Sequence, residues 1–174
     1  MSLNRIGKKA EALLKRLAML NAPPIDVHRV AQELGLRILT ANLGDGVSGI
    51  LARKQGSPTV ICVHEDDAAI RQRFTIAHEI GHHYLDHVLE GDWQVHVDRG
   101  IVSHKGTRSE GALRYEIEAN QFAASLLMPA ELIIPRAAEL SQGPLLDVHL
   151  SELASEFQVA EHAMTIRLIT LDLV

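Results

Sequence analysis

Residues 78–82 read His78-Glu79-Ile80-Gly81-His82, with two histidines four positions apart and a glutamate directly after the first. Residues four positions apart lie on one face of a helix, one turn from each other, so both imidazoles can bind a single metal ion. The carboxylate of Glu79 then lies beside that ion, where it can accept a proton from a bound water. This spacing predicts a catalytic zinc site, provided that the segment is helical.

The residues around this pentapeptide favour a helix. An apolar stripe with helical spacing runs from Ile70 to Val88, and the acidic residues 65–67 can supply a cap and negative charge at its start. We expect this helix to extend past His87. The two histidines therefore lie within a regular helix, which is the context that the chemistry needs.

The rest of the chain predicts a small sheet and further helices. Three strands separated by glycine-containing turns are expected at residues 36–40, 47–53 and 59–64. Helices are expected near the N-terminus, over residues 26–34, over 109–128 and twice within 145–174. Residues 89–108 are polar and contain several glycines, and we interpret them as a loop with a short strand near Trp93 to Val97. The predicted fold is α+β, with a small three-stranded sheet packed on helices and a helical C-terminal segment.

Composition limits the location and the partners of the chain. The formal net charge is −5 and Lys and Arg do not cluster, so direct binding to nucleic acid is not expected. No apolar stretch approaches the roughly 18 residues of a membrane span, and no membrane association is expected. Cys62 is the only cysteine, which indicates a reduced, cytoplasmic protein.

A structural zinc site normally uses cysteine thiolates, and a single cysteine cannot supply them. The expected site is therefore catalytic, with three protein ligands and an open position for water, so a third ligand is needed. The candidates are His83, His87, His96, His104, Glu116 and Glu118. His83 and His87 point away from His82 on a helix, and we expect both to be partly solvated surface residues. The two other histidines lie in the expected loop and can approach the site without binding the metal.

Glu116 is favoured over Glu118 as the third ligand. Glu116 and Asn120 are four positions apart, so both lie on a face of the second helix that is otherwise small and apolar. A charged group on such a face needs a partner, and a metal ion is a suitable one. Glu118 points elsewhere and is expected to be solvated. Asn120 can accept an N–H from a metal-bound imidazole, or it can be a surface amide.

Residues 73–82 and 116–129 together resemble the ImmA/IrrE family of metallopeptidases. The first segment is RFTIAHEIGH and the second is EIEANQFAASLLMP. The motif Pro24-Ile25-Asp26-Val27 also matches the N-terminal pattern of that family. The resemblance extends from about residue 10 to residue 134, with a weaker similarity over residues 157–171.

The resemblance implies a zincin-like fold with a glutamate as third metal ligand, as in gluzincins. It makes His78, His82 and Glu116 the ligands of one Zn²⁺ per chain, with Mn²⁺ as another possible ion. It makes Glu79 the catalytic base and Asn120 a supporting residue. We accordingly expect a metallopeptidase domain over residues 1–134, and a helix-turn-helix-like segment over 145–174 that packs on it or docks the substrate.

The implied reaction is hydrolysis of a peptide bond, with a helix-turn-helix transcriptional repressor as the substrate. Members of the family typically cleave such repressors at one site, in phage or mobile-element control or in stress responses. A further donor is expected to stabilise the oxyanion, and Tyr115, His104 and Arg108 are the candidates. The contribution of residues 89–108 to substrate binding stays open.

Two other classes of function remain. The chain can be a metal-binding regulator that sequesters a repressor without cutting it, although binding alone needs no base such as Glu79. It can also be a DNA-binding regulator that uses residues 145–171 as a helix-turn-helix, although that segment has a single Lys or Arg, Arg167. We expect the segment to contact protein.

Overall fold

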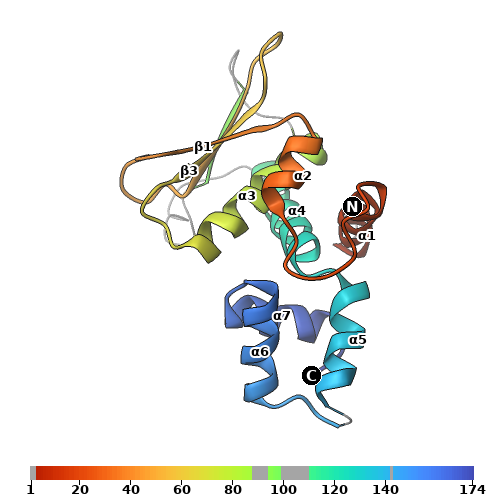
Figure 1. The fold of residues 1–174 in the computed structure, drawn as a ribbon. Coiled ribbons are helices and arrows are strands. Elements are labelled where there is room, and N and C mark those ends of the chain that lie inside the picture. The colour runs from red at the N-terminus through yellow and green to blue at the C-terminus, as the bar shows by residue number, and fades with distance from the viewer. Residues whose placement is uncertain (1–2, 88–93, 99–109, 142) are drawn as a thin grey trace. The chain divides into compact units, whose positions relative to one another are not determined.

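A computed structural model describes residues 3–87, 94–98, 110–141 and 143–174 (Figure 1). The elements are, in chain order, α1 (Leu3–Arg16), α2 (Val27–Glu33), β1 (Arg37–Ala41), β2 (Gly49–Arg53), β3 (Val60–His64), α3 (Ala69–Tyr84), β4 (Gln94–Asp98), α4 (Glu110–Leu127), α5 (Ala130–Leu140), α6 (Asp147–Phe157) and α7 (Glu161–Thr170). This mixture of helices with one small sheet confirms the predicted α+β class.

The chain forms two compact units. One consists of residues 27–123, and the other of residues 1–26 together with 124–174. The first unit contains the sheet and the His-Glu-x-x-His helix, and the second contains the C-terminal helices. The functional division into residues 1–134 and 145–174 stays a prediction.

The sheet has four strands, in the order β1-β3-β2-β4. β1 pairs with β3 in parallel, whereas β2 pairs with both β3 and β4 in antiparallel fashion. The three predicted strands are present, and the fourth is formed by residues 94–98, within the predicted short strand and one residue beyond it. The partner of this fourth strand, β2, lies more than forty residues earlier in the chain, and sequence patterns do not reveal pairing over such a distance.

Helix α3 packs on the sheet through β2 and β3, as Figure 1 shows. Leu51, Ile61 and Ile76 are completely buried in this core. On another side, Gly81 of α3 lies so close to α4 that an added Cβ would be 3.2 Å from the Cα of Ala119. Helices α3 and α4 can therefore approach at backbone distance only because residue 81 has no side chain.

Both ends of α3 differ from the prediction. Residues 65–67 form a turn after β3, so the helix begins only after Ala68. Ala68 makes no side-chain capping bond. It ends at Tyr84 and does not extend past His87. Asp86 has a φ of 54°, and this left-handed conformation turns the chain back. His87 is consequently outside the helix, and its side chain is directed by the turn.

The second unit has its own core. Most of its fully buried side chains come from α1 and from helical residues after 124, among them Leu13, Leu14, Leu126, Leu153, Phe157 and Leu168. In the last helix, Ile166 and Ile169 are exposed, whereas Arg167 is buried. The guanidinium Nε of Arg167 donates to the carbonyl oxygen of Met128 at 2.9 Å, and this bond directs the side chain inward.

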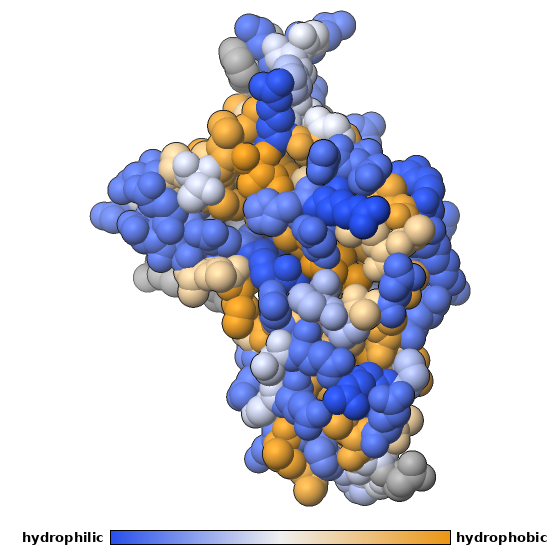
Figure 2. Space-filling model, in the orientation of Figure 1, coloured by the Kyte–Doolittle hydropathy of each residue, from blue (hydrophilic) through white to orange (hydrophobic). Residues whose placement is uncertain are grey.

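Hydrophilic residues cover most of the face drawn in Figure 2, with hydrophobic residues between them. Among the described helices, none has the length and apolar character needed to cross a bilayer.

Candidate metal centre

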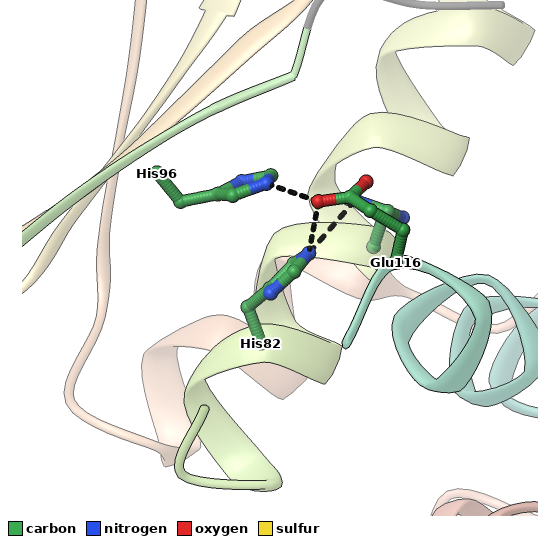
Figure 3. A group of neighbouring side chains, drawn as sticks. His82, His96 and Glu116 are labelled. Atoms are coloured by element: carbon green, nitrogen blue, oxygen red, sulfur yellow. Dashed lines mark hydrogen bonds and ion pairs between the residues drawn. The ribbon is translucent and has the colours of Figure 1, made fainter. Parts of the chain in front are cut away.

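Four side chains from three elements converge in the unit of residues 27–123. His78 and His82 come from α3, His96 from β4 and Glu116 from α4. Each offers one nitrogen or oxygen atom, and these atoms all lie within 4.8 Å of one another. Figure 3 shows His82, His96 and Glu116 pointing toward a common place. Three nitrogens and a carboxylate oxygen form a donor set that suits zinc.

The distances among His78, His82 and Glu116 fit one tetrahedral ion. The Nε2 atoms of the two histidines are 3.1 Å apart. Oε2 of Glu116 lies 3.6 Å from Nε2 of His78, and Oε1 of Glu116 lies 3.7 Å from Nε2 of His82. Ligands at about 2.0–2.1 Å from a tetrahedral zinc ion are separated by about 3.3–3.4 Å. These three residues therefore make a ligand triangle of the required size.

His96 makes a different kind of contact. Its Nε2 lies 2.7 Å from Glu116 Oε1, which is the distance of a charge-assisted hydrogen bond and shorter than the separation of two zinc ligands. Its Nδ1 lies 3.0 Å from Glu79 Oε2, and its ring stacks on His82 with 3.8 Å between centroids. His96 thus joins the predicted base to the predicted third ligand.

The sheet register explains how His96 reaches the cluster. His96 lies directly opposite Leu51 in the antiparallel pair of β2 and β4. Residues opposite each other in such a pair have their side chains on the same face of the sheet. Leu51 is completely buried beneath α3, so His96 is also directed toward α3. In the sequence, the alternation of polar and apolar residues along 94–98 was the one indication of a strand that contains His96. Without its partner strand, the alternation did not show which face of the sheet His96 occupies.

Glu79 is completely buried, with its carboxylate directed toward His96. Gly49 at the start of β2 makes room for it. A Cβ at position 49 would lie 3.4 Å from Glu79 Oε1 and 2.3 Å from Cγ2 of Thr75. The carboxylate is therefore held in one place by its surroundings, as a general base requires.

Asn120 lies beside the first histidine. Its Oδ1 is 3.0 Å from Nδ1 of His78. Because Nε2 of His78 faces the cluster, Nδ1 carries the proton and donates it to the amide oxygen. Asn120 is an exposed residue that nevertheless contacts this imidazole, and its role in supporting a metal ligand stays a prediction.

The ionisable groups of the cluster have shifted pKa values. Burial lowers the pKa of His96, but hydrogen bonds to Glu116 and Glu79 outweigh it and raise that pKa to about 10. Burial raises the pKa of Glu116, but hydrogen bonds with His78 and His96 outweigh it and hold that pKa far below its usual value. Burial, together with His96 and His78, holds the pKa of His82 far below its usual value. These shifts favour a neutral His82 and an ionised Glu116, the forms that bind metal. Burial lowers the pKa of His78, but a hydrogen bond to Glu116 and the charge of Glu79 outweigh it and raise that pKa.

Two interpretations of the sequence were wrong. His87 and Glu118 were expected to be solvated, yet their exposed fractions are 3% and 6%. The end of α3 at Tyr84 folds His87 back, so that its Nδ1 lies 3.1 Å from Nδ1 of His82. Its Nε2 lies 3.3 Å from Glu118 Oε2. A helix continued to residue 87 would have placed this imidazole on another face.

The remaining candidates do not join the cluster within the described residues. His83 is half-buried, and its Nδ1 has no hydrogen-bond partner in the described part of the chain. Tyr115 stacks on His87, with 4.4 Å between ring centroids. His104 and Arg108 lie outside the described residues, so these two candidate oxyanion donors stay predictions.

Comparison with known proteins gives two findings. The model of a peptidase family, described as the IrrE N-terminal-like domain, matches residues 31–168. A Mycobacterium tuberculosis transcriptional regulator of known structure has a TM-score of 0.62 and 19% sequence identity. The match covers 95% of this chain and 46% of that one, so the chain spans less than half of the regulator. At this identity the likeness shows the fold alone. No curated protein gives a significant match.

Proposed function

The chain belongs to the IrrE N-terminal-like domain family of peptidases, and from that premise we propose that it is a zinc-dependent endopeptidase. The observation that carries the proposal is the ligand triangle of His78, His82 and Glu116 with a buried carboxylate, Glu79, next to His78. A site that only stores or senses a metal does not need such a base.

The proposed mechanism assigns a task to each residue. A zinc ion held by His78, His82 and Glu116 would polarise the scissile carbonyl and lower the pKa of a water. Glu79 takes a proton from the attacking water and later gives it to the leaving nitrogen. His96 holds the carboxylate of Glu79 in position through its Nδ1–H.

The proposed substrate is a helix-turn-helix transcriptional repressor, cut at one site. The resemblance of residues 73–82 and 116–129 to repressor-cleaving peptidases supports this class. The structural neighbour is itself named a transcriptional regulator, which is consistent with a place in gene control. We also propose a cytoplasmic location, since the only cysteine, Cys62, is free.

Direct binding to DNA is not part of the proposal. Residues 143–174 contain one Lys or Arg, and that residue, Arg167, is buried. A surface that binds phosphates needs exposed cations, which displace the counterions of the duplex.

The test compares the wild type with Glu79→Gln. Both proteins are loaded with one equivalent of zinc and incubated with a purified helix-turn-helix repressor as candidate substrate, and cleavage is followed by mass spectrometry. The amide keeps the shape of the side chain but accepts no proton, so we expect a rate about 10²–10⁴-fold lower with unchanged zinc content. Binding of the repressor by the wild type without cleavage would instead favour a sequestering regulator. Cleavage by the variant at the normal rate would exclude Glu79 as the base.

A further inference from the structure

A row of polar side chains continues from the metal cluster on the far side of His82, buried as far as Glu118 and ending in the exposed Arg114. Nδ1 of His82 contacts Nδ1 of His87 at 3.1 Å, and Nε2 of His87 contacts Oε2 of Glu118 at 3.3 Å. The other carboxylate oxygen of Glu118 accepts a hydrogen bond from Nε of Arg114 at 2.9 Å. None of the last three residues belongs to the ligand triangle, so the function proposed above leaves this row unexplained.

The donors and acceptors of the row fit one arrangement of protons. Nε2 of His82 faces the cluster and must offer its lone pair to a metal, so the proton of this imidazole is on Nδ1. That N–H donates to Nδ1 of His87, which must then be unprotonated. The proton of His87 is consequently on Nε2, where it donates to the carboxylate of Glu118. Any other pair of neutral tautomers leaves two donors or two acceptors facing each other.

The surrounding structure holds His87 in this position. Arg53 of β2 donates to the carbonyl oxygens of His82 at 2.9 Å and of His87 at 3.4 Å, and so ties together the two ends of the turn. The ring of Tyr115 stacks on the ring of His87 at an interplanar angle of 15°. The position of the imidazole is therefore set by contacts with β2 and α4.

We propose that His87 and Glu118 are positioning residues that fix the tautomer and the orientation of the metal ligand His82. The negative charge of Glu118 acts on His82 through the imidazole of His87 and makes Nε2 a stronger donor to the metal. A histidine ligand in a metal site generally donates its other N–H to a carboxylate or carbonyl group. Here a second imidazole stands between the ligand and the carboxylate. The inference rests on the metal site of the proposed function.

Zinc affinity, measured by competition with a chelator, tests the inference without any substrate. His87→Phe keeps a ring against Tyr115 but removes the acceptor for His82, and we expect zinc binding about 10–100-fold weaker. Glu118→Gln keeps an acceptor for His87 but loses the charge, so its loss should be smaller. His87→Gln restores an acceptor and should recover part of the affinity. His83→Phe is the matched control, since it changes the neighbouring histidine, and its affinity should equal that of the wild type.

Nitrogen-15 spectra of the imidazoles give a readout that a merely structural role would not change. In the zinc-loaded wild type, His82 should be protonated on Nδ1 and His87 on Nε2. The inference is wrong if His87 carries its proton on Nδ1, or if His87→Phe binds zinc as tightly as the wild type. Failure of the wild type to bind zinc would overturn the metal site and this inference together. Zinc binding without proteolysis would overturn the proposed activity alone.

Discussion

The residues of the cluster divide into two groups by the atoms that they present. His78, His82 and Glu116 place their atoms 3.1–3.7 Å apart, as ligands of one ion do. His96 instead directs both ring nitrogens to carboxylates, at 3.0 and 2.7 Å. The cluster therefore contains three residues that can bind a metal ion and one, His96, that binds carboxylates. Substitutions should separate these two roles.

Substitution of the third ligand should abolish stoichiometric metal binding. Glu116→Ala removes the carboxylate nearest to both imidazoles, and we expect the purified protein to retain well under one zinc ion per chain by elemental analysis. Glu118→Ala should still bind one ion at saturating zinc, with lower affinity. Glu110→Ala changes an exposed glutamate of the same helix and serves as the control. Loss of zinc at saturation from Glu118→Ala but not from Glu116→Ala would reverse the assignment.

Substitution of His96 should lower activity more than metal content. His96→Ala removes the N–H that holds Glu79, and we expect kcat/KM to fall about 10–100-fold, as for other residues that orient a catalytic group. Zinc content should stay at one ion per chain. His162→Ala, which changes an exposed histidine, should match the wild type in both measurements. Loss of zinc from His96→Ala would make this residue a fourth ligand.

Local spacing predicted some residues of the cluster and could not predict others. His78 and His82 are related by one turn of a helix, and Glu116 and Asn120 by another, so their faces follow from the sequence. The position of His87 depends on the left-handed conformation of Asp86, which ends α3 where the apolar periodicity continues. The position of His96 depends on the register of β4 against β2. The first is the backbone conformation of one residue and the second is a long-range strand pairing, and hydrophobic periodicity reveals neither.

At the level of elements, the approach of α3 to α4 sets the distance between the histidines and Glu116. Gly81 lies between the two histidine positions on α3, and an added Cβ would be 3.2 Å from the backbone oxygen of Ala119 and 3.3 Å from Cβ of Phe122. Glu116 is one turn before Ala119 on α4. Close contact of the helices at Gly81 therefore brings the carboxylate within reach of the imidazoles.

A large side chain at position 81 should damage both the fold and the site. We expect Gly81→Leu to lower the free energy of unfolding by about 1–3 kcal/mol or more, because the neighbours are backbone atoms that cannot rotate away. Zinc affinity should fall as well, since the displaced α4 carries Glu116. Urea denaturation and chelator competition measure the two effects. Gly143→Leu is the control, because nothing lies within 4 Å of an added Cβ there. Equal stability of both variants would contradict the proposed helix contact.

At the level of the whole molecule, the C-terminal helices are part of a core that also includes α1. Leu153, Phe157 and Leu168 are completely buried together with Ile6 and Leu13. Burial of side chains of this size is worth about 1.5–3 kcal/mol each. Deletion of residues 145–174 would therefore unfold this unit and would not test a role in substrate docking, which stays a prediction. A single substitution within the unit is a cleaner probe.

Arg167 distinguishes a structural C-terminal unit from a DNA-binding one. In a DNA-binding protein this residue would be the phosphate contact of residues 143–174. In the structure its Nε donates to the carbonyl oxygen of Met128 at 2.9 Å, and its Nη2 lies 3.7 Å from Oε1 of Glu11. Arg167→Ala leaves those two oxygens without this buried partner. We therefore expect the free energy of unfolding to fall by about 1.5–3 kcal/mol, the usual cost of losing a hydrogen bond to a charged group.

The measurement combines urea denaturation with anisotropy of labelled duplex DNA at about 50 and 200 mM salt, a range in which phosphate contacts weaken strongly. Lys8→Ala removes an exposed cation of α1 in the same unit and should change stability by less than about 0.5 kcal/mol. Neither variant should differ from the wild type in DNA binding, because the cation at position 167 is not on the surface. Salt-sensitive DNA binding by the wild type that is lost in Arg167→Ala, with stability unchanged, would place Arg167 at a DNA interface and refute the structural role.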